Sequence, residues 1–210
     1  PKIYLRLKML NQDTVKLLSE LSLSMFTKNF FGIFQGAISA KLDHEHFMIN
    51  SKDAVFDNLD DKSFCTLNMN KPDYRWNIAS LDAYTHSAIY TNIHEAKYIA
   101  FGMPIYTTAY TLGHDNIIFE DYFGKILFGE VPIYNPGDLS TWKERSALEI
   151  TKSIKNTDHN LLVIKGIGTY IYDRDIHELV KKIAILENSC RLLSIKSTFR
   201  WFFIKFNKKL

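Results

Sequence analysis

The segment from residue 161 to residue 193 constrains the fold more than any other part of this chain. Residues 161–164 are four consecutive apolar residues, which predicts a buried strand. Gly166 and Gly168 mark a turn, after which residues 169–172 return as a second strand. The sequence therefore predicts a pair of core strands that leads directly into a helix.

The predicted helix has both a start signal and an apolar stripe. Asp175 and Glu178 are three residues apart, which is the spacing of a capping box at the start of a helix. One face then collects apolar residues at helical spacing: Ile176, Leu179, Val180, Ile183, Leu186, Cys190 and Leu193. This pattern predicts a long amphipathic helix whose apolar face packs on the core.

The rest of the chain alternates helices with short strands. Helical periodicity predicts helices over residues 11–28, 80–93 and 142–154. Short apolar runs predict paired strands at 46–50 and 54–56 and further strands at 97–101, 117–119 and 131–134. The predicted fold class is α/β, a three-layer α/β/α sandwich with a mostly antiparallel central sheet. We expect one domain over residues 1–196, followed by a basic aromatic tail over 197–210.

Charge and cysteine usage exclude several classes of protein. The net charge of +3 comes from 26 basic and 23 acidic residues, too even a balance for a nucleic-acid-binding surface over the whole molecule. Cys65 and Cys190 are far apart and show no metal-site spacing, so we expect free thiols and a cytoplasmic location. No apolar run reaches the roughly 18 residues that a transmembrane helix needs, and residues 1–10 are too charged for a signal peptide.

Four short blocks, in order, resemble the class II aldolase/adducin family, which includes fuculose-phosphate aldolase and the adducin head. The first block is Gly-Ala-Ile-Ser at 36–39, where the family has Gly-Asn-Ile/Val-Ser, and the second is Ser-Leu-Asp at 80–82 with His at 86, where the family has Ser-Ser-Glu and a following His. The third block is Phe-Gly-Met-Pro at 101–104, where the family has His-x-His, and the fourth is Lys-Gly at 165–166, where the family has His-Gly. The fifteen residues from His86 to Phe101 also match the separation in the family.

The resemblance implies a zinc enzyme whose ligands this chain lacks. In active members three histidines hold Zn²⁺ with an open position, and the metal stabilises the enediolate formed when a keto-sugar phosphate is cleaved. The three ligand positions correspond here to Phe101, Met103 and Lys165, and the acid/base glutamate corresponds to Asp82. The phosphate-binding Asn has become Ala37. The hydroxyls that remain to hold a substrate are those of Ser39, Ser51 and Ser80.

Three residues are therefore candidates for a rebuilt, metal-free site: Asp82, His86 and Lys165. For Lys165 we favour an ion pair with Asp82 that fills the former metal pocket. The alternative is an amine that replaces the charge of zinc or forms a Schiff base with a carbonyl substrate. Asp82 and His86, four residues apart on a helix, form either an acid/base pair or a hydrogen bond on the helix face.

The resemblance and the tail together suggest what the chain binds. Family members commonly form cyclic tetramers with their C-terminal segments near the interface, so the resemblance implies a homo-oligomer, with a tetramer expected, in which the aromatic tail packs on a neighbouring subunit. Contact of the tail with an anionic membrane surface is the other interpretation. We expect no cofactor and favour a non-zinc binding or assembly protein with a possible sugar or sugar-phosphate ligand. The alternative is a metal-free sugar-phosphate aldolase, a carbon–carbon lyase.

Overall fold

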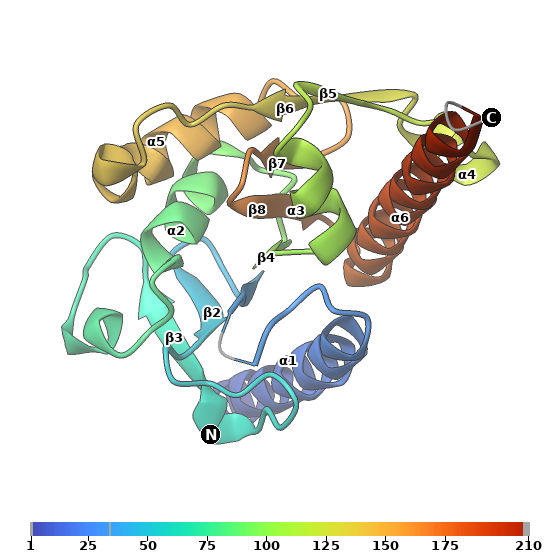
Figure 1. Ribbon diagram of the computed structural model, residues 1–210. Helices are drawn as coiled ribbons and strands as arrows, with labels where there is room; N and C mark the ends of the chain where they lie inside the picture. Colours follow the sequence, from blue (N-terminus) through green and yellow to red (C-terminus); the bar gives the residue numbers. More distant parts are fainter. Residues whose placement is uncertain (1, 34, 208–210) are drawn as a thin grey trace.

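The computed structural model describes the backbone of residues 2–33 and 35–207 and the side chains of residues 12–33 and 35–199. It is a single α/β unit (Figure 1). The helices are α1 (Lys2–Thr27), α2 (Ala83–Asn92), α3 (Ile105–Thr111), α4 (Tyr122–Leu127), α5 (Trp142–Ile154) and α6 (Ile176–Asn207), with short 3₁₀ turns at Asp61–Ser63, Tyr74–Asn77 and Leu139–Thr141. The strands are β1 (Ala37–Lys41), β2 (His46–Asn50), β3 (Phe64–Asn68), β4 (Tyr98–Gly102), β5 (Asn116–Ile118), β6 (Glu130–Tyr134), β7 (Leu161–Ile164) and β8 (Gly168–Asp173).

All eight strands form one sheet in the order β3-β2-β1-β4-β8-β7-β6-β5. Every neighbouring pair is antiparallel except β6 and β7, which are parallel. The predicted α/β fold class is therefore confirmed, with a mixed sheet that has one parallel pair.

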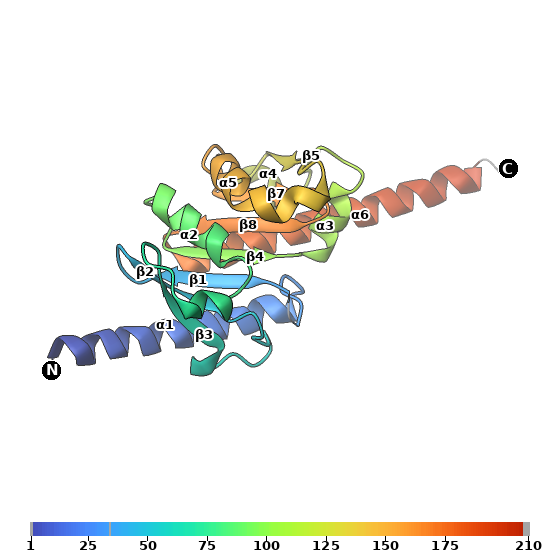
Figure 2. The same cartoon turned by 90° about the vertical axis from the view of Figure 1, so that its left-hand side faces the viewer.

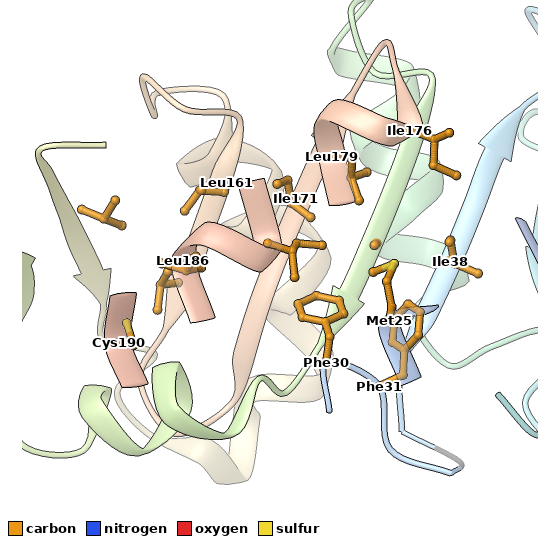
Figure 3. Packing of buried hydrophobic residues seen from close by; sticks show 14 of the residues in the cluster. Met25, Phe30, Phe31, Ile38, Leu161, Ile171, Ile176, Leu179, Leu186 and Cys190 are labelled. Atoms are coloured by element: carbon orange, nitrogen blue, oxygen red, sulfur yellow. The ribbon is translucent and has the colours of Figure 1, made fainter. Parts of the chain in front are cut away.

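Helices cover both faces of the sheet and enclose two separate cores. One core packs α1 and α6 against one face, and Figure 3 shows part of it, including Met25, Phe30, Ile171 and Leu186. The other core packs α2 and α5 against the opposite face. Side chains of β1 alternate between the two faces of the sheet. Ile38 packs in the first core, while Ser39 contacts α2 on the opposite face.

Helix α6 continues through the predicted boundary between domain and tail. Its apolar stripe is buried as predicted, from Ile176 at 2% exposure to Leu193 at 8%. Asp175 accepts a hydrogen bond from the backbone N–H of His177, but Glu178 pairs with Lys181, so half of the predicted capping box forms. The 32-residue helix spans about 48 Å and extends beyond the sheet (Figure 2). The aromatic side chains from Trp201 onwards lie outside the described residues.

Two sequence expectations differ from the structure. Residues 54–56 do not form a strand, and β2 pairs instead with β3, which the sequence analysis missed. Ala54 and Phe56 are buried within a loop, which explains why their apolar pattern resembled a strand. In addition, α1 begins at Lys2, well before residue 11. No helix in the described part of the chain is long and apolar enough to cross a membrane.

The contact between β4 and β8 gives a first prediction. Gly168 has a φ of +145°, and a β-carbon there would overlap the carbonyl oxygen of Gly102 in β4. Gly168→Ala should therefore lower the free energy of unfolding by about 2 kcal/mol or more, because it adds backbone strain to a steric clash. The control is Gly113→Ala, where an added β-carbon meets no atom within 4 Å. Urea denaturation measures both, and equal losses would contradict the explanation.

Candidate functional site

The candidate site forms where β4 and β8 lie side by side under the start of α2. Phe101 of β4 stands directly opposite Tyr170 of β8, so both side chains project from the same face of the sheet. Their rings stack with centroids 4.4 Å apart and an interplanar angle of 25°. Phe101 is half-buried, and its ring also lies against Gly168. An aromatic pair thus occupies the first of the positions that the sequence resemblance assigns to a metal ligand.

Tyr170 connects this aromatic pair to Asp82. Its hydroxyl donates a hydrogen bond to Oδ1 of Asp82, the residue at the N-terminus of α2. Asp82 makes no side-chain capping bond to the helix, so its carboxyl is directed to Tyr170. Burial raises the pKa of Asp82, and the hydrogen bond from Tyr170 opposes that shift. Burial and the neighbouring carboxyl also raise the pKa of Tyr170, so the phenol remains a proton donor.

The predicted ion pair between Lys165 and Asp82 is wrong. Nζ of Lys165 lies 2.8 Å from Oδ1 of Asp115, which precedes β5, and this hydrogen bond lowers the pKa of the Asp115 carboxyl. The backbone explains the choice of partner. The N–H of Lys165 donates to the carbonyl of Tyr134 in β6, which holds the turn after β7 on the β5/β6 side of the sheet. The ammonium therefore pairs with Asp115, while Asp82 pairs with Tyr170.

His86 belongs to a second polar cluster, deeper under α2. Its ring is fully buried, with Nδ1 2.7 Å from the hydroxyl of Ser39, which in turn lies 2.7 Å from the hydroxyl of Tyr90. Nε2 has no hydrogen-bond partner among the described residues. Burial lowers the pKa of His86 to about 3, so the ring is neutral. The side chains of Asp82 and His86 do not bond to each other, because each binds a different residue of the sheet.

The three candidate substrate-binding serines lie at two depths. Ser51 forms an isolated bridge with Ala79, and the N–H of Ser80 donates to the carbonyl of Asn50. The hydroxyl of Ser80 accepts a bond from the N–H of Asp82 at 3.3 Å. Ser51 and Ser80 therefore lie close to the candidate site. Ser39, in contrast, is fully buried in the His86 cluster.

The side chains at the three positions that the sequence resemblance assigns to metal ligands are a poor set of donors for zinc. The ring of Phe101 has no lone pair to donate to a metal, the thioether of Met103 is a poor zinc ligand, and Nζ of Lys165 donates to Asp115. Met103 is half-buried, and its N–H donates to the carbonyl of Phe30. Across the described side chains, no three His, Cys, Asp or Glu residues gather closely enough to hold a metal.

Sequence reasoning missed two residues of this site, Tyr170 and Asp115. Each binds a predicted candidate, Asp82 and Lys165 respectively. One signal for Tyr170 was present: alternation along residues 168–173 places it on the opposite face from Ile171. The sequence had no such signal for Asp115, an exposed residue in a loop.

A groove of about 920 Å³ lies elsewhere, between α1 and the strands β1 to β3. Its lining includes Lys41, His46 and Tyr98, but not Asp82, Phe101 or Lys165. It is therefore separate from the candidate site.

The burial of His86 predicts a specific pH dependence of stability. An unfolded histidine has a pKa near 6.5, whereas His86 in the folded chain has a pKa of about 3. As the pH falls below about 6.5, protons bind the unfolded chain first, so the free energy of unfolding should fall by on the order of 4 kcal/mol by pH 3. The variant His86→Gln has no titrating group at this position. The difference in the free energy of unfolding between the wild type and this variant should therefore shrink as the pH falls. Parallel profiles from urea denaturation would contradict this assignment.

The corrected pairing predicts which residues are energetically coupled. A double-mutant cycle of Asp82→Leu with Tyr170→Phe should give a coupling of about 1–3 kcal/mol, because either single change removes their shared hydrogen bond. The matched cycle of Asp82→Leu with Lys165→Met should give less than about 0.5 kcal/mol, because Lys165 pairs with Asp115. Chemical denaturation measures both. Coupling only in the second cycle would restore the ion pair expected from the sequence.

Solved structures similar to this chain include several aldolases. L-fuculose-1-phosphate aldolase from Thermus thermophilus has a TM-score of 0.78 at 16% identity, covering 89% of this chain and 95% of that one. YgbL from Escherichia coli has a TM-score of 0.73 at 18% identity, covering 89% and 90%. A sugar-phosphate aldolase from Thermotoga maritima has a TM-score of 0.71 at 14% identity, covering 89% and 96%. At these identities the likeness establishes the fold.

The family rests on a separate comparison. No curated protein sequence matches this chain. The family model described as Class II Aldolase and Adducin N-terminal domain matches residues 16–194, which is most of the chain and includes all four sequence blocks. The resemblance found in the sequence is confirmed, and the chain belongs to the class II aldolase and adducin N-terminal domain family.

Proposed function

We propose that this chain is a class II aldolase-family protein that does not use zinc and acts as a binding or assembly protein. One observation carries the proposal: the side chains at two of the three positions that the resemblance assigns to metal ligands, Phe101 and Lys165, and at the assigned acid/base position, Asp82, contact other residues of the chain. Phe101 stacks on Tyr170, and Tyr170 holds Asp82. A ligand set for a metal needs lone pairs directed at a common point. The ring of Phe101 has no lone pair, and the ammonium of Lys165 donates to Asp115.

Exposed apolar side chains at the start of α2 and at the two ends of α3 support a role in binding proteins. Leu81 and Tyr84, on either side of Asp82, are 80% and 62% exposed, and Ile105 and Leu112 at the two ends of α3 are 58% and 68% exposed. Apolar groups gathered near a site are typical of protein–protein contacts. A second copy of the chain is the partner we propose for this surface, which gives a homo-oligomer. Light scattering tests it, and a monomeric mass would contradict it.

The ligand class that we propose for the site is a sugar or sugar phosphate. Two of the similar structures are aldolases named for such compounds. The hydroxyl of Ser80 lies beside Asp82, and the backbone of Ser51 pairs with that of Ala79 next to it, so both serines bring a neutral hydroxyl to this region, although Ala37 offers no side-chain donor. The buried, unpaired thiols of Cys65 and Cys190 are compatible with the cytoplasm.

A variant with three added histidines tests the proposal that the chain does not bind zinc. We expect the wild-type chain, purified and dialysed against a weak chelator, to contain no stoichiometric zinc in elemental analysis. Substituting three imidazoles through Phe101→His, Met103→His and Lys165→His should create a site that retains about one zinc per chain, because the fold matches that of a solved class II aldolase. The matched control is Phe101→Leu, Met103→Leu and Lys165→Met. One zinc per wild-type chain that is lost in this control would overturn the proposal.

The rival function is a metal-free lyase that uses the amine of Lys165. Such an amine must have a free lone pair to attack a carbonyl, whereas Nζ of Lys165 donates to Asp115. Borohydride added with dihydroxyacetone phosphate should therefore trap no adduct at Lys165 in mass spectrometry. An adduct that disappears in Lys165→Met would establish the enzyme instead.

A further inference from the structure

The outer surfaces of α4 and of the second half of α6 carry large apolar side chains that are exposed to water. Six residues, each between 40% and 73% exposed, make up what we call the α4/α6 apolar face: Tyr122, Phe123, Ile126, Leu192, Ile195 and Phe199. None of them belongs to the candidate site or to the apolar residues beside it. A folded monomer rarely leaves such a group exposed unless it contacts something.

The two halves of this face are adjacent. Helix α4 lies beside α6, and a β-carbon at Gly124 would come within 2.6 Å of the hydroxyl of Ser189. From Ser189, helical spacing places Leu192, Lys196 and Phe199 along the same side of α6. Lys196 pairs with Glu120, which lies just before α4. This ion pair is a second contact between the α4 region and the same side of α6. The exposed apolar residues of α6 therefore border those of α4.

Positive charge is concentrated at the two ends of the chain, and the larger share lies in the segment that continues the α4/α6 apolar face. Six of the 26 basic residues lie in residues 191–210, which contain no acidic residue, and three more lie in residues 1–11, also without an acidic one. Residues 12–190 therefore contain 17 basic and 23 acidic residues and have a net charge of −6. Helix α6 leads away from this acidic body as far as Asn207 (Figure 2).

We propose that the α4/α6 apolar face docks on a membrane surface that is rich in anionic lipids. Aromatic and aliphatic side chains next to lysine and arginine are the combination that lies in the headgroup region of a bilayer. Each basic residue near an anionic surface adds attraction. A second copy meeting this face symmetrically would bring two segments with six basic and no acidic residues together, and that repulsion disfavours self-contact.

Vesicle cosedimentation tests this proposal with the full chain. The wild type should bind vesicles of equal parts phosphatidylglycerol and phosphatidylcholine, and should bind pure phosphatidylcholine at least about tenfold more weakly. Raising the salt concentration should reduce binding. The variant Tyr122→Ser, Phe123→Ser and Ile126→Ser should lose at least about tenfold in affinity, because three apolar side chains no longer enter the bilayer.

A matched control separates membrane contact from general loss of apolar surface. Leu139→Ser with Leu148→Ser removes two residues that are 61% and 76% exposed near and on α5, and this variant should bind vesicles as the wild type does. All five substituted residues are exposed, so both variants should fold. Deleting residues 197–210 should weaken binding further by removing four basic residues.

Three results would overturn the proposal. The first is a wild type that does not bind anionic vesicles. The second is an α4 variant that binds as tightly as the wild type does. The third is a fall in mass by light scattering in the α4 variant or the truncated chain without any change in vesicle binding, which would assign the face to contact between copies of the chain.

Discussion

The side chain of Tyr170 connects the central sheet to the helix that covers it. Its ring stacks on Phe101 across the β4/β8 pair, and its hydroxyl holds Asp82 at the start of α2. The strand register fixes the ring pair, because Phe101 and Tyr170 are direct partners, and the close contact of the strands requires glycine at Gly168. The register of β4 and β8 thereby determines where the carboxyl group of Asp82 lies and that it contacts the hydroxyl of Tyr170.

Behind this contact, a second polar cluster ties α2 to the sheet again. Ser39 of β1 bridges His86 and Tyr90, which lie one turn apart on α2, and the whole cluster is buried. Keeping the imidazole neutral there makes the fold sensitive to acid. Together the two clusters hold α2 at its first residues and along its length. That arrangement fixes the position of Asp82 relative to the sheet.

The sequence predicts the fold and the family better than it predicts the partners of single residues. The apolar run at 161–164, the glycine turn and the stripe of α6 each follow from local sequence patterns, and all three are present. Periodicity identifies the face on which a side chain lies but not the atom it meets there. Lys165 pairs with a residue 50 positions away and Asp82 with one 88 positions away, and strand register and turn geometry decide both pairings. Residues 54–56 show the same limit, since apolar loop anchors have the pattern of a strand.

The central proposal is that the chain does not bind zinc, because Phe101, Met103 and Lys165 stand at the positions that the sequence resemblance assigns to the metal ligands. Its most direct test is the thermal unfolding midpoint of the wild-type chain with and without excess Zn²⁺. A metal that binds only the folded chain adds about 2.7 kcal/mol of stability at one hundred times its dissociation constant, which corresponds to a rise of several degrees. The account predicts the same midpoint in both samples. A rise of several degrees, with one zinc retained per chain after desalting and lost in Met103→Leu, would contradict it.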